Sequence, residues 1–451
     1  MTKRDIFIDN YRMQTSTLET TPTGAVEAVP RFRTILPTVA ASALEGYDLT
    51  IYGLFAGTIS RQFFPEGNAS TGLMLTVASL GVGYVMRPLG GILLGAYGDR
   101  VGRKAAIFLT VALMALSTGA MGLVPSYASI GAWAPLLILV ARLIQGFAAG
   151  GGASSSISFL SEVSPSKRRG FFASWHQTIQ VGAFLFASAL AAVIANMVPA
   201  DHANAIGWRI PFLLSLALGP IAWVIRSNLK EPEVFLKQKA ASVKEQGASR
   251  IVHVLSGSVR QVAIGFGVSC LWTITSFLLL IFMPTYANKS FGIPLSGAYS
   301  SAVVGGIIVF VLCPLFGRLS DKLGRRTTLL IAAGLIACCI YPLFFYIGAK
   351  RTVLSLIIVQ GILSVLIAAY TGPIGAFMAE LFPTSVRATG VSIANNLAVT
   401  LVGSFAPLIT TYLIRVTHNP LAPAYYIAGG AIVSVVALLC ARDRTGQPLA
   451  K

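Results

Sequence analysis

Residues 95–104 read Gly95-Ala96-Tyr97-Gly98-Asp99-Arg100-Val101-Gly102-Arg103-Lys104. The same pattern returns in the second half of the chain as Gly317-Arg318-Leu319-Ser320-Asp321-Lys322-Leu323-Gly324-Arg325-Arg326. A second pattern, Glu162-x-x-Pro165-x-x-x-Arg169, returns at nearly the same offset as Glu380-x-x-Pro383-x-x-x-Arg387. Two independent motifs that repeat in the same order and at nearly one offset indicate that the chain is a duplication of one structural unit.

The composition is that of a membrane protein. Of 451 residues, 55% are hydrophobic and 11% are charged, against roughly 25% charged in a typical soluble domain. The net charge of +18 does not indicate nucleic-acid binding, because the basic residues lie between long apolar runs and do not form one basic face. The five cysteines fall in apolar stretches without metal-ligand spacing, so we expect small hydrophobic side chains and no metal site.

Twelve stretches are long and apolar enough to cross a bilayer, which takes about 20 mostly apolar residues. They are 34–60, 71–98, 105–124, 133–161, 171–198, 210–229, 260–284, 297–317, 327–349, 353–379, 388–413 and 424–441. We predict an all-α membrane protein with twelve transmembrane helices in two pseudo-symmetric six-helix bundles, 34–229 and 260–441. A cytoplasmic linker over 230–259 joins the bundles. Residues 1–33 form a polar tail that we expect to be disordered, and 442–451 form a second tail.

The basic residues set the expected orientation. Of the 34 Lys and Arg residues, 26 fall in alternate connections with their adjoining span ends and in the two tails, 6 fall in the other connections, and Arg87 and Arg142 lie well inside spans. By the positive-inside rule, both termini are expected in the cytoplasm. Much of the excess positive charge is therefore explained by topology.

Four charged residues lie well inside predicted spans: Glu45, Asp48, Arg87 and Arg142. Four unpaired charges would cost on the order of 10 kcal/mol at roughly 2.5–3.5 kcal/mol each, so we expect them to be paired or hydrated. Glu45 and Asp48 are separated by two residues and share one helix face. Counting inward from the span ends puts Glu45 and Arg142 at similar depth.

The repeated loop motif resembles the signature of the major facilitator superfamily. Further stretches resemble the metabolite:proton symporter family within it: Leu44–Asp48, Arg87–Gly91, Arg142–Gly146, Arg169–Phe171, Ser174–Gln177 and Trp208–Phe212. Leu73–Thr76, Val85–Pro88 and Gly95–Tyr97 are similar to the citrate, tricarballylate and α-ketoglutarate carriers of that family. Two positions depart from the family. Gly46 stands where an aromatic residue is usual, and Gly152-Ala153-Ser154 lacks the usual acid.

The resemblance implies a gate at the cytoplasmic end. Its expected residues are Gly95, Asp99, Arg100, Gly102, Arg103, Glu162, Arg169, Asp321, Gly324, Arg325, Glu380 and Arg387. Gly102 and Gly324 permit tight turns. We expect Arg103 to pair with Glu162 and Arg325 with Glu380, holding the inner surface shut in one state. The alternative is that these charges only anchor helix ends in the headgroups.

The resemblance also places the first and fourth spans at a central cavity, where Glu45 and Arg142 are expected to pair. Proton coupling is assigned to Glu45 and Asp48, because like charges and burial raise a carboxyl pKa. Substrate contacts are expected from Tyr52, Arg87, Arg142, Gln145, Gln177, Tyr370, Asn395 and Asn396. Alternatives are a static ion pair for these carboxylates and, for Arg87, a side chain that extends to the headgroups. We expect His176 to be interfacial; a titrating role near pH 6.5 is the alternative.

The expected function is proton-coupled import of a small organic acid, a di- or tricarboxylate such as citrate, because two intramembrane arginines favour an anion. The alternatives are uptake of proline or betaine, uptake of an aromatic or hydroxy acid, and efflux. No nucleotide loop, HExxH motif or nucleophile elbow indicates an enzyme. We expect no cofactor besides the coupling proton, no catalytic residues and no nucleic-acid partner. The resemblance implies a monomer, surrounded by lipid, in a bacterial inner membrane.

Overall fold

The computed structural model describes residues 18–20, 26–28, 32–63, 69–197, 207–217 and 257–449. Two short strands, β1 (Leu18–Thr20) and β2 (Val26–Ala28), pair in antiparallel register within the tail that precedes the first helix. The rest of the regular structure described is helical.

The described residues of the first half form seven labelled helices. They are α2 (Phe32–Leu54), α3 (Ala56–Phe63), α4 (Ala69–Arg100), α5 (Arg103–Leu123), α6 (Tyr127–Ile130), α7 (Trp133–Val163) and α8 (Arg169–Met197). Residues 209–217 are also helical and belong to the sixth predicted span, whose remainder, 218–229, lies outside the described residues.

The second half follows the same order. It contains α13 (Val259–Thr275), η2 (Ser276–Phe282), α14 (Met283–Phe291), α15 (Leu295–Leu323), α16 (Arg325–Lys350), α17 (Val353–Leu381), η3 (Thr384–Val386), α18 (Arg387–Ala398), η4 (Val399–Gly403), α19 (Ala406–Thr417) and α20 (Ala422–Leu439). The seventh and eleventh spans each contain a π-helical segment, η2 or η4, that joins two α-helices. Such segments are common at functional sites in helices.

The prediction of an all-α membrane fold is confirmed. In the described part of the chain, nine helices are long and apolar enough to cross a membrane. Many large apolar side chains on these helices face outward, among them Leu116, Leu335 and Val436. Lipid is a solvent in which such an apolar exterior is stable.

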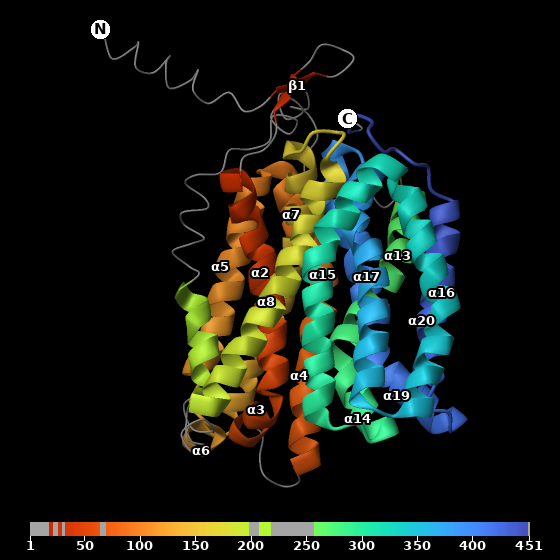
Figure 1. Ribbon diagram of the computed structural model, residues 1–451. Coiled ribbons are helices and arrows are strands. Elements are labelled where there is room, and N and C mark those ends of the chain that lie inside the picture. Colours follow the sequence, from red (N-terminus) through yellow and green to blue (C-terminus); the bar gives the residue numbers. More distant parts are fainter. Residues whose placement is uncertain are drawn as a thin grey trace, which may run out of the picture.

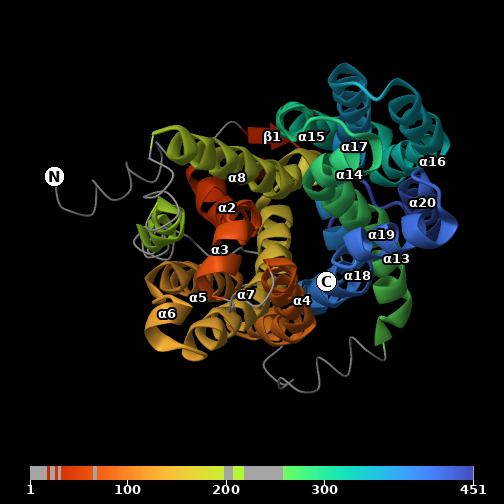
Figure 2. The same cartoon turned by 90° about the horizontal axis from the view of Figure 1, so that it is seen from below.

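The two halves stand side by side. Seen along the bundle, α2–α8 lie on one side and α13–α20 on the other (Figure 2). They meet along two seams, α4 against α18 and α8 against α15. The repeated loop motif lies at the upper end of Figure 1, here called the motif end, while α3, α6, α14 and α19 lie at the opposite end.

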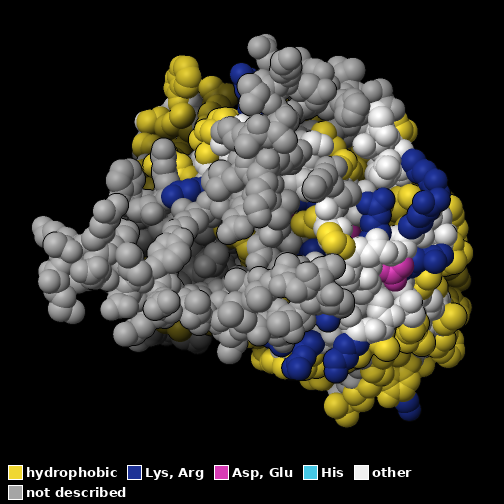
Figure 3. Space-filling model, turned by 90° about the horizontal axis from the view of Figure 1, so that it is seen from above, with side chains coloured by type: hydrophobic (Ala, Val, Ile, Leu, Met, Phe, Trp, Pro, Cys, Tyr) yellow, Lys and Arg dark blue, Asp and Glu magenta, His cyan; other side chains and the backbone are white. Residues whose placement is uncertain are grey.

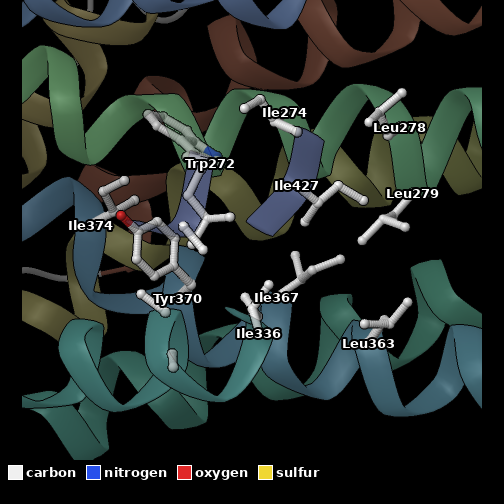
Figure 4. Packing of buried hydrophobic residues seen from close by; sticks show 14 of the residues in the cluster. Trp272, Ile274, Leu278, Leu279, Ile336, Leu363, Ile367, Tyr370, Ile374 and Ile427 are labelled. Atoms are coloured by element: carbon white, nitrogen blue, oxygen red, sulfur yellow. The ribbon is translucent and has the colours of Figure 1, made fainter. Parts of the chain in front are cut away.

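Each half has its own apolar core. In the second half, Figure 4 shows Trp272 and Ile274 of α13 facing Ile367 and Tyr370 of α17, with Ile427 of α20 close by. The charged residues gather elsewhere. Figure 3 views the motif end, where Lys and Arg side chains are scattered over the described part of the face, with Asp or Glu between them. Apolar contacts also cross the seam, because Ile92 of α4 packs against Val386 and Ile393 and the ring of Tyr84 lies against that of Phe277.

Candidate functional site

The four intramembrane charges form two buried ion pairs. Glu45 on α2 pairs with Arg87 on α4, and Asp48 pairs with Arg142 on α7 at 3.1 Å. The expectation that these charges are paired is confirmed, but the expected pairing of Glu45 with Arg142 is wrong. Glu45 lies as far from the start of α2 as Arg87 lies from the end of the antiparallel α4, so these two reach the same depth. Arg142 lies nearer the opposite end, at the level of Asp48.

Asp48 is held by three neighbours. Its Oδ1 accepts hydrogen bonds from Thr118 Oγ1 at 2.9 Å and from Gln145 Nε2 at 2.7 Å, while Oδ2 faces Arg142. The Arg142 guanidinium also lies over the ring of Tyr52, with 3.4 Å between its central carbon and the ring centroid. Such stacking stabilises a desolvated guanidinium.

Part of this cluster has unused hydrogen-bonding capacity. Among the described residues, Arg142 Nε and Nη2 and Gln145 Oε1 are buried without a hydrogen-bond partner. Arg142 is only 4% exposed. Burying a charged donor without an acceptor costs free energy. A polar ligand that supplies an acceptor to Arg142 would therefore gain more binding free energy here than at a donor that is already bonded.

The Glu45–Arg87 pair reaches the second half. Arg87 Nε donates to Asn396 Oδ1 on α18 at 3.4 Å, and Asn396 Nδ2 donates to the Gly150 carbonyl of α7 at 2.7 Å. Arg87 is thus buried between α2 and α18. The alternative that it extends to the headgroups is wrong, because both of its partners lie inside the bundle.

His176 on α8 lies beside the same pair. It is 2% exposed, and its Nδ1 lies 2.6 Å from Ser42 Oγ on α2. The expectation of an interfacial histidine is therefore wrong. The sequence placed it near a span end, but the side chain turns inward between α8 and α2.

Three other predicted substrate residues lie away from the two buried ion pairs or contact other parts of the protein. Gln177 Oε1 accepts from Trp272 Nε1 at 3.2 Å, which links α8 to α13 across the halves. Tyr370 Oη donates to the Val268 carbonyl at 2.8 Å inside the second half. Asn395 is buried, and its Oδ1 has no hydrogen-bond partner among the described residues.

At the motif end, each repeated aspartate caps a helix of the other half. Asp99 accepts from the backbone amides of Ala388 at 3.4 Å and Thr389 at 3.0 Å, in the first turn of α18. Asp321 accepts from the amides of Gly170 at 2.8 Å and Phe171 at 3.0 Å, in the first turn of α8. A carboxylate at a helix N-terminus satisfies free amides and matches the helix dipole.

The repeated glutamates form ion pairs that also cross the halves. Glu162 pairs with Arg387 at 2.8 Å, and Glu380 pairs with Arg169. Arg325 lies 3.2 Å from Glu380, as predicted, and 3.1 Å from Asp321. These contacts join the two halves at the motif end, and the ion pairs of one half are repeated in the other by the pseudo-twofold symmetry.

The expected partner of Glu162, Arg103, has a side chain outside the described residues, so that pairing stays a prediction. Arg100 is exposed at the end of α4. Gly102 and Gly324 adopt φ values of 144° and 95°, which confirms that the turns need glycine.

Small residues let the halves approach. A Cβ atom at Gly95 would lie 3.1 Å from the Thr389 Cα, and one at Gly91 would meet Ser392 and Asn396. Gly91, Gly95 and Asp99 recur once per helical turn and so share one face of α4. The sequence motif showed Gly95 and Asp99. It did not show that this face continues to Gly91, or that Ser392 and Thr389 lie opposite.

Two helical halves that are closed at one end and contain buried charges near their interface define a secondary transporter. The chain belongs to the Major Facilitator Superfamily, whose profile matches residues 38–407. It is 31% identical over 407 residues to a citrate-proton symporter of Klebsiella pneumoniae, covering 90% of this chain and 91% of that one. The resemblance inferred from the motifs is thereby confirmed.

One further relative and one solved structure resemble the chain. It is 31% identical over 418 residues to a putative proline/betaine transporter of Staphylococcus aureus (strain COL), covering 92% of this chain and 88% of that one. The structure of the proton:xylose symporter XylE bound to 6-bromo-6-deoxy-D-glucose superposes with a TM-score of 0.78 at 18% identity, covering 93% of this chain and 97% of that one. The first is named as a transporter, and the second shows that the fold of this chain is that of a known symporter.

Proposed function

We propose that the chain is a proton-coupled symporter that imports a small organic acid, a di- or tricarboxylate such as citrate, by alternating access. The observation that carries the proposal is the buried Arg142, which is paired with Asp48 and keeps Nε and Nη2 without partners among the described residues. A planar guanidinium with two available donors is suited to a carboxylate. The citrate-proton symporter among the relatives supports the same substrate class.

Proton coupling is assigned to Glu45. Asp48 has three hydrogen-bond or ion-pair partners, whereas among the described residues the ion-pair partner of Glu45 is Arg87. Protonation of Glu45 removes its negative charge and frees Arg87 for a second substrate carboxylate. One proton and one anion then cross together, with no cofactor besides the proton.

The closed motif end is assigned to the cytoplasmic side by the basic residues of its loops. The described conformation is then closed toward the cytoplasm. The chain would act as a monomer in the bacterial inner membrane, with lipid around it and a small anion as its partner.

A second candidate is uptake of proline or betaine. Its supporting observation is the 31% identity to the proline/betaine transporter, equal to that for the citrate relative. Arg142 alone could bind the single carboxylate of such a substrate, while Arg87 would remain paired with Glu45. The two candidates differ in the number of arginines that the substrate engages.

A panel of ligands tests the proposal on the purified chain. A ligand that binds the folded state raises its thermal stability by RT ln(1 + [L]/Kd). Citrate or α-ketoglutarate is expected to stabilise the wild type and to have little effect on Arg142→Gln. Stabilisation by proline or betaine alone would contradict the organic-acid proposal and support the second candidate.

A further inference from the structure

Asn396 connects the two halves at the ion pair assigned to proton coupling. It is 1% exposed on α18. Its Nδ2 donates to the Gly150 carbonyl at 2.7 Å and to Ser392 Oγ at 3.0 Å, and its Oδ1 accepts from Arg87 Nε at 3.4 Å. Both polar atoms of the amide are used by the protein itself, so Asn396 is not assigned to the substrate contacts that were expected of it from the sequence.

Arg87 contacts both sides of the seam. Its Nη2 holds Glu45 on α2, and its Nε faces Asn396 on α18. Glu45 and Arg87 interact electrostatically with Tyr84 on α4 and with His176 on α8, and Asp48 on α2 and Arg142 on α7 also act on Tyr84. Within the described part of α18, the group that reaches Arg87 is the neutral amide of Asn396.

We propose that Asn396 couples the protonation of Glu45 to the separation of α4 from α18. This inference rests on the proposed function. While Glu45 is ionised, it holds Arg87 in the orientation that bonds Asn396, and the two halves stay joined here. A proton taken from solution by the Glu45 carboxylate neutralises it, and Arg87 is then free to turn toward a substrate carboxylate.

The contact between Asn396 and Arg87 is lost in that step, and α18 can move away from α4 at lower cost. Without the proton, opening would break the Asn396–Arg87 contact while Glu45 still orients Arg87. Asn396 is therefore a positioning residue that prevents opening of the motif end before proton loading. The side chain at this position has to be neutral. A carboxylate here would hold Arg87 whether Glu45 is protonated or ionised.

The chain offers a matched control. Ser392 Oγ donates to the same Gly150 carbonyl at 2.9 Å, also across the seam. Within the described residues, its hydrogen-bond partners are this carbonyl and Asn396, and not Arg87. Ser392→Ala weakens the junction of α18 with α7 and leaves the Arg87–Asn396 contact in place. It therefore separates a general loosening of the seam from a loss of coupling.

The test measures proton and citrate fluxes together in proteoliposomes under an imposed pH gradient. Asn396→Ala is expected to keep citrate exchange and to lower the proton-to-citrate ratio at least twofold, while Ser392→Ala keeps the wild-type ratio. Asn396→Asp, which preserves the side-chain shape, is expected to keep the ratio and to slow turnover at least tenfold.

An unchanged ratio in Asn396→Ala, or wild-type turnover in Asn396→Asp, would overturn the inference while wild-type coupling stands. A proton-to-citrate ratio that falls as much in Ser392→Ala as in Asn396→Ala would overturn the inference as well. A wild type that moves citrate without protons would instead contradict the proposed function, so the two failures are distinguishable.

Discussion

Asp99 on α4 binds Thr389 on α18 twice, through the backbone amide at 3.0 Å and through the side-chain hydroxyl at 2.5 Å. The two residues are far apart in the sequence and belong to different halves. The Asp99 carboxylate therefore acts as an N-terminal cap that is supplied from outside the helix. Closure of the motif end therefore supplies the N-terminal cap of α18 through Asp99 and that of α8 through Asp321.

Asp99→Asn is expected to nearly abolish transport and to leave equilibrium substrate binding within a few-fold of wild type. Hydrogen bonds to a charged group contribute about 1.5–3 kcal/mol, and their loss destabilises the closed motif end without touching Arg142. Transport and binding are measured on the same preparation.

Lys322→Gln, an exposed change in the same motif, is the control and should transport normally. If binding falls in parallel with transport in Asp99→Asn, the assignment of Asp99 to the gate is wrong.

Glu162→Gln is expected to open the motif end. Glu162 and Arg387 have side chains that are fully buried, and removing one partner of a buried pair costs roughly 3–5 kcal/mol. Hydrogen exchange should then accelerate in 169–174 and 387–392, where backbone amides donate to Asp321 and Asp99. Exchange at the wild-type rate in both segments would show that the ion pair does not hold the closed state.

Glu45→Gln is expected to abolish accumulation of substrate driven by a pH gradient and to retain counterflow exchange, which needs no net proton movement. The glutamine is permanently neutral and imitates the protonated state. Asp443→Asn, an exposed carboxylate beyond α20, is the control. If Glu45→Gln still concentrates substrate, the proton site lies elsewhere, with Asp48 and then His176 as the next candidates.

Arg142→Gln is expected to weaken binding of a dicarboxylate or tricarboxylate about 30-fold or more, since removing one charged partner from a buried pair costs about 2–5 kcal/mol. Arg142→Lys should restore only part of the affinity, because the planar fork is lost. Arg415→Gln, exposed at the end of α19, serves as control. An affinity for Arg142→Gln equal to that of wild type would remove Arg142 from the substrate site.

The sequence predicts the helices and the repeated motif well, for physical reasons. A membrane span has to be apolar over its whole length, so hydropathy alone locates it. The buried charges could be found in the same way, because each is an exception in an apolar run. Glu45, Asp48, Arg87 and Arg142 are therefore all predicted.

The partners of these residues, within a half or across the seam, could not be predicted in this way. Glu45 pairs with Arg87 and not with Arg142, because the pairing depends on depth differences of about one turn. Asn396 bonds the Gly150 carbonyl, and every residue type presents such a carbonyl, so no side-chain pattern marks this partner. The position of His176 likewise depends on how α8 is rotated about its own axis, which decides whether this residue faces α2 or the lipid.

Proton-driven uptake tests the central claim most directly. Proteoliposomes that contain the purified chain, oriented and loaded at alkaline pH, are placed in acidic medium with labelled citrate, α-ketoglutarate, proline or betaine. The account predicts that citrate or α-ketoglutarate accumulates above its external concentration, that collapse of the pH gradient stops it, and that Glu45→Gln does not accumulate it. Accumulation of proline or betaine alone, or accumulation of an organic acid that persists without the pH gradient, would contradict it.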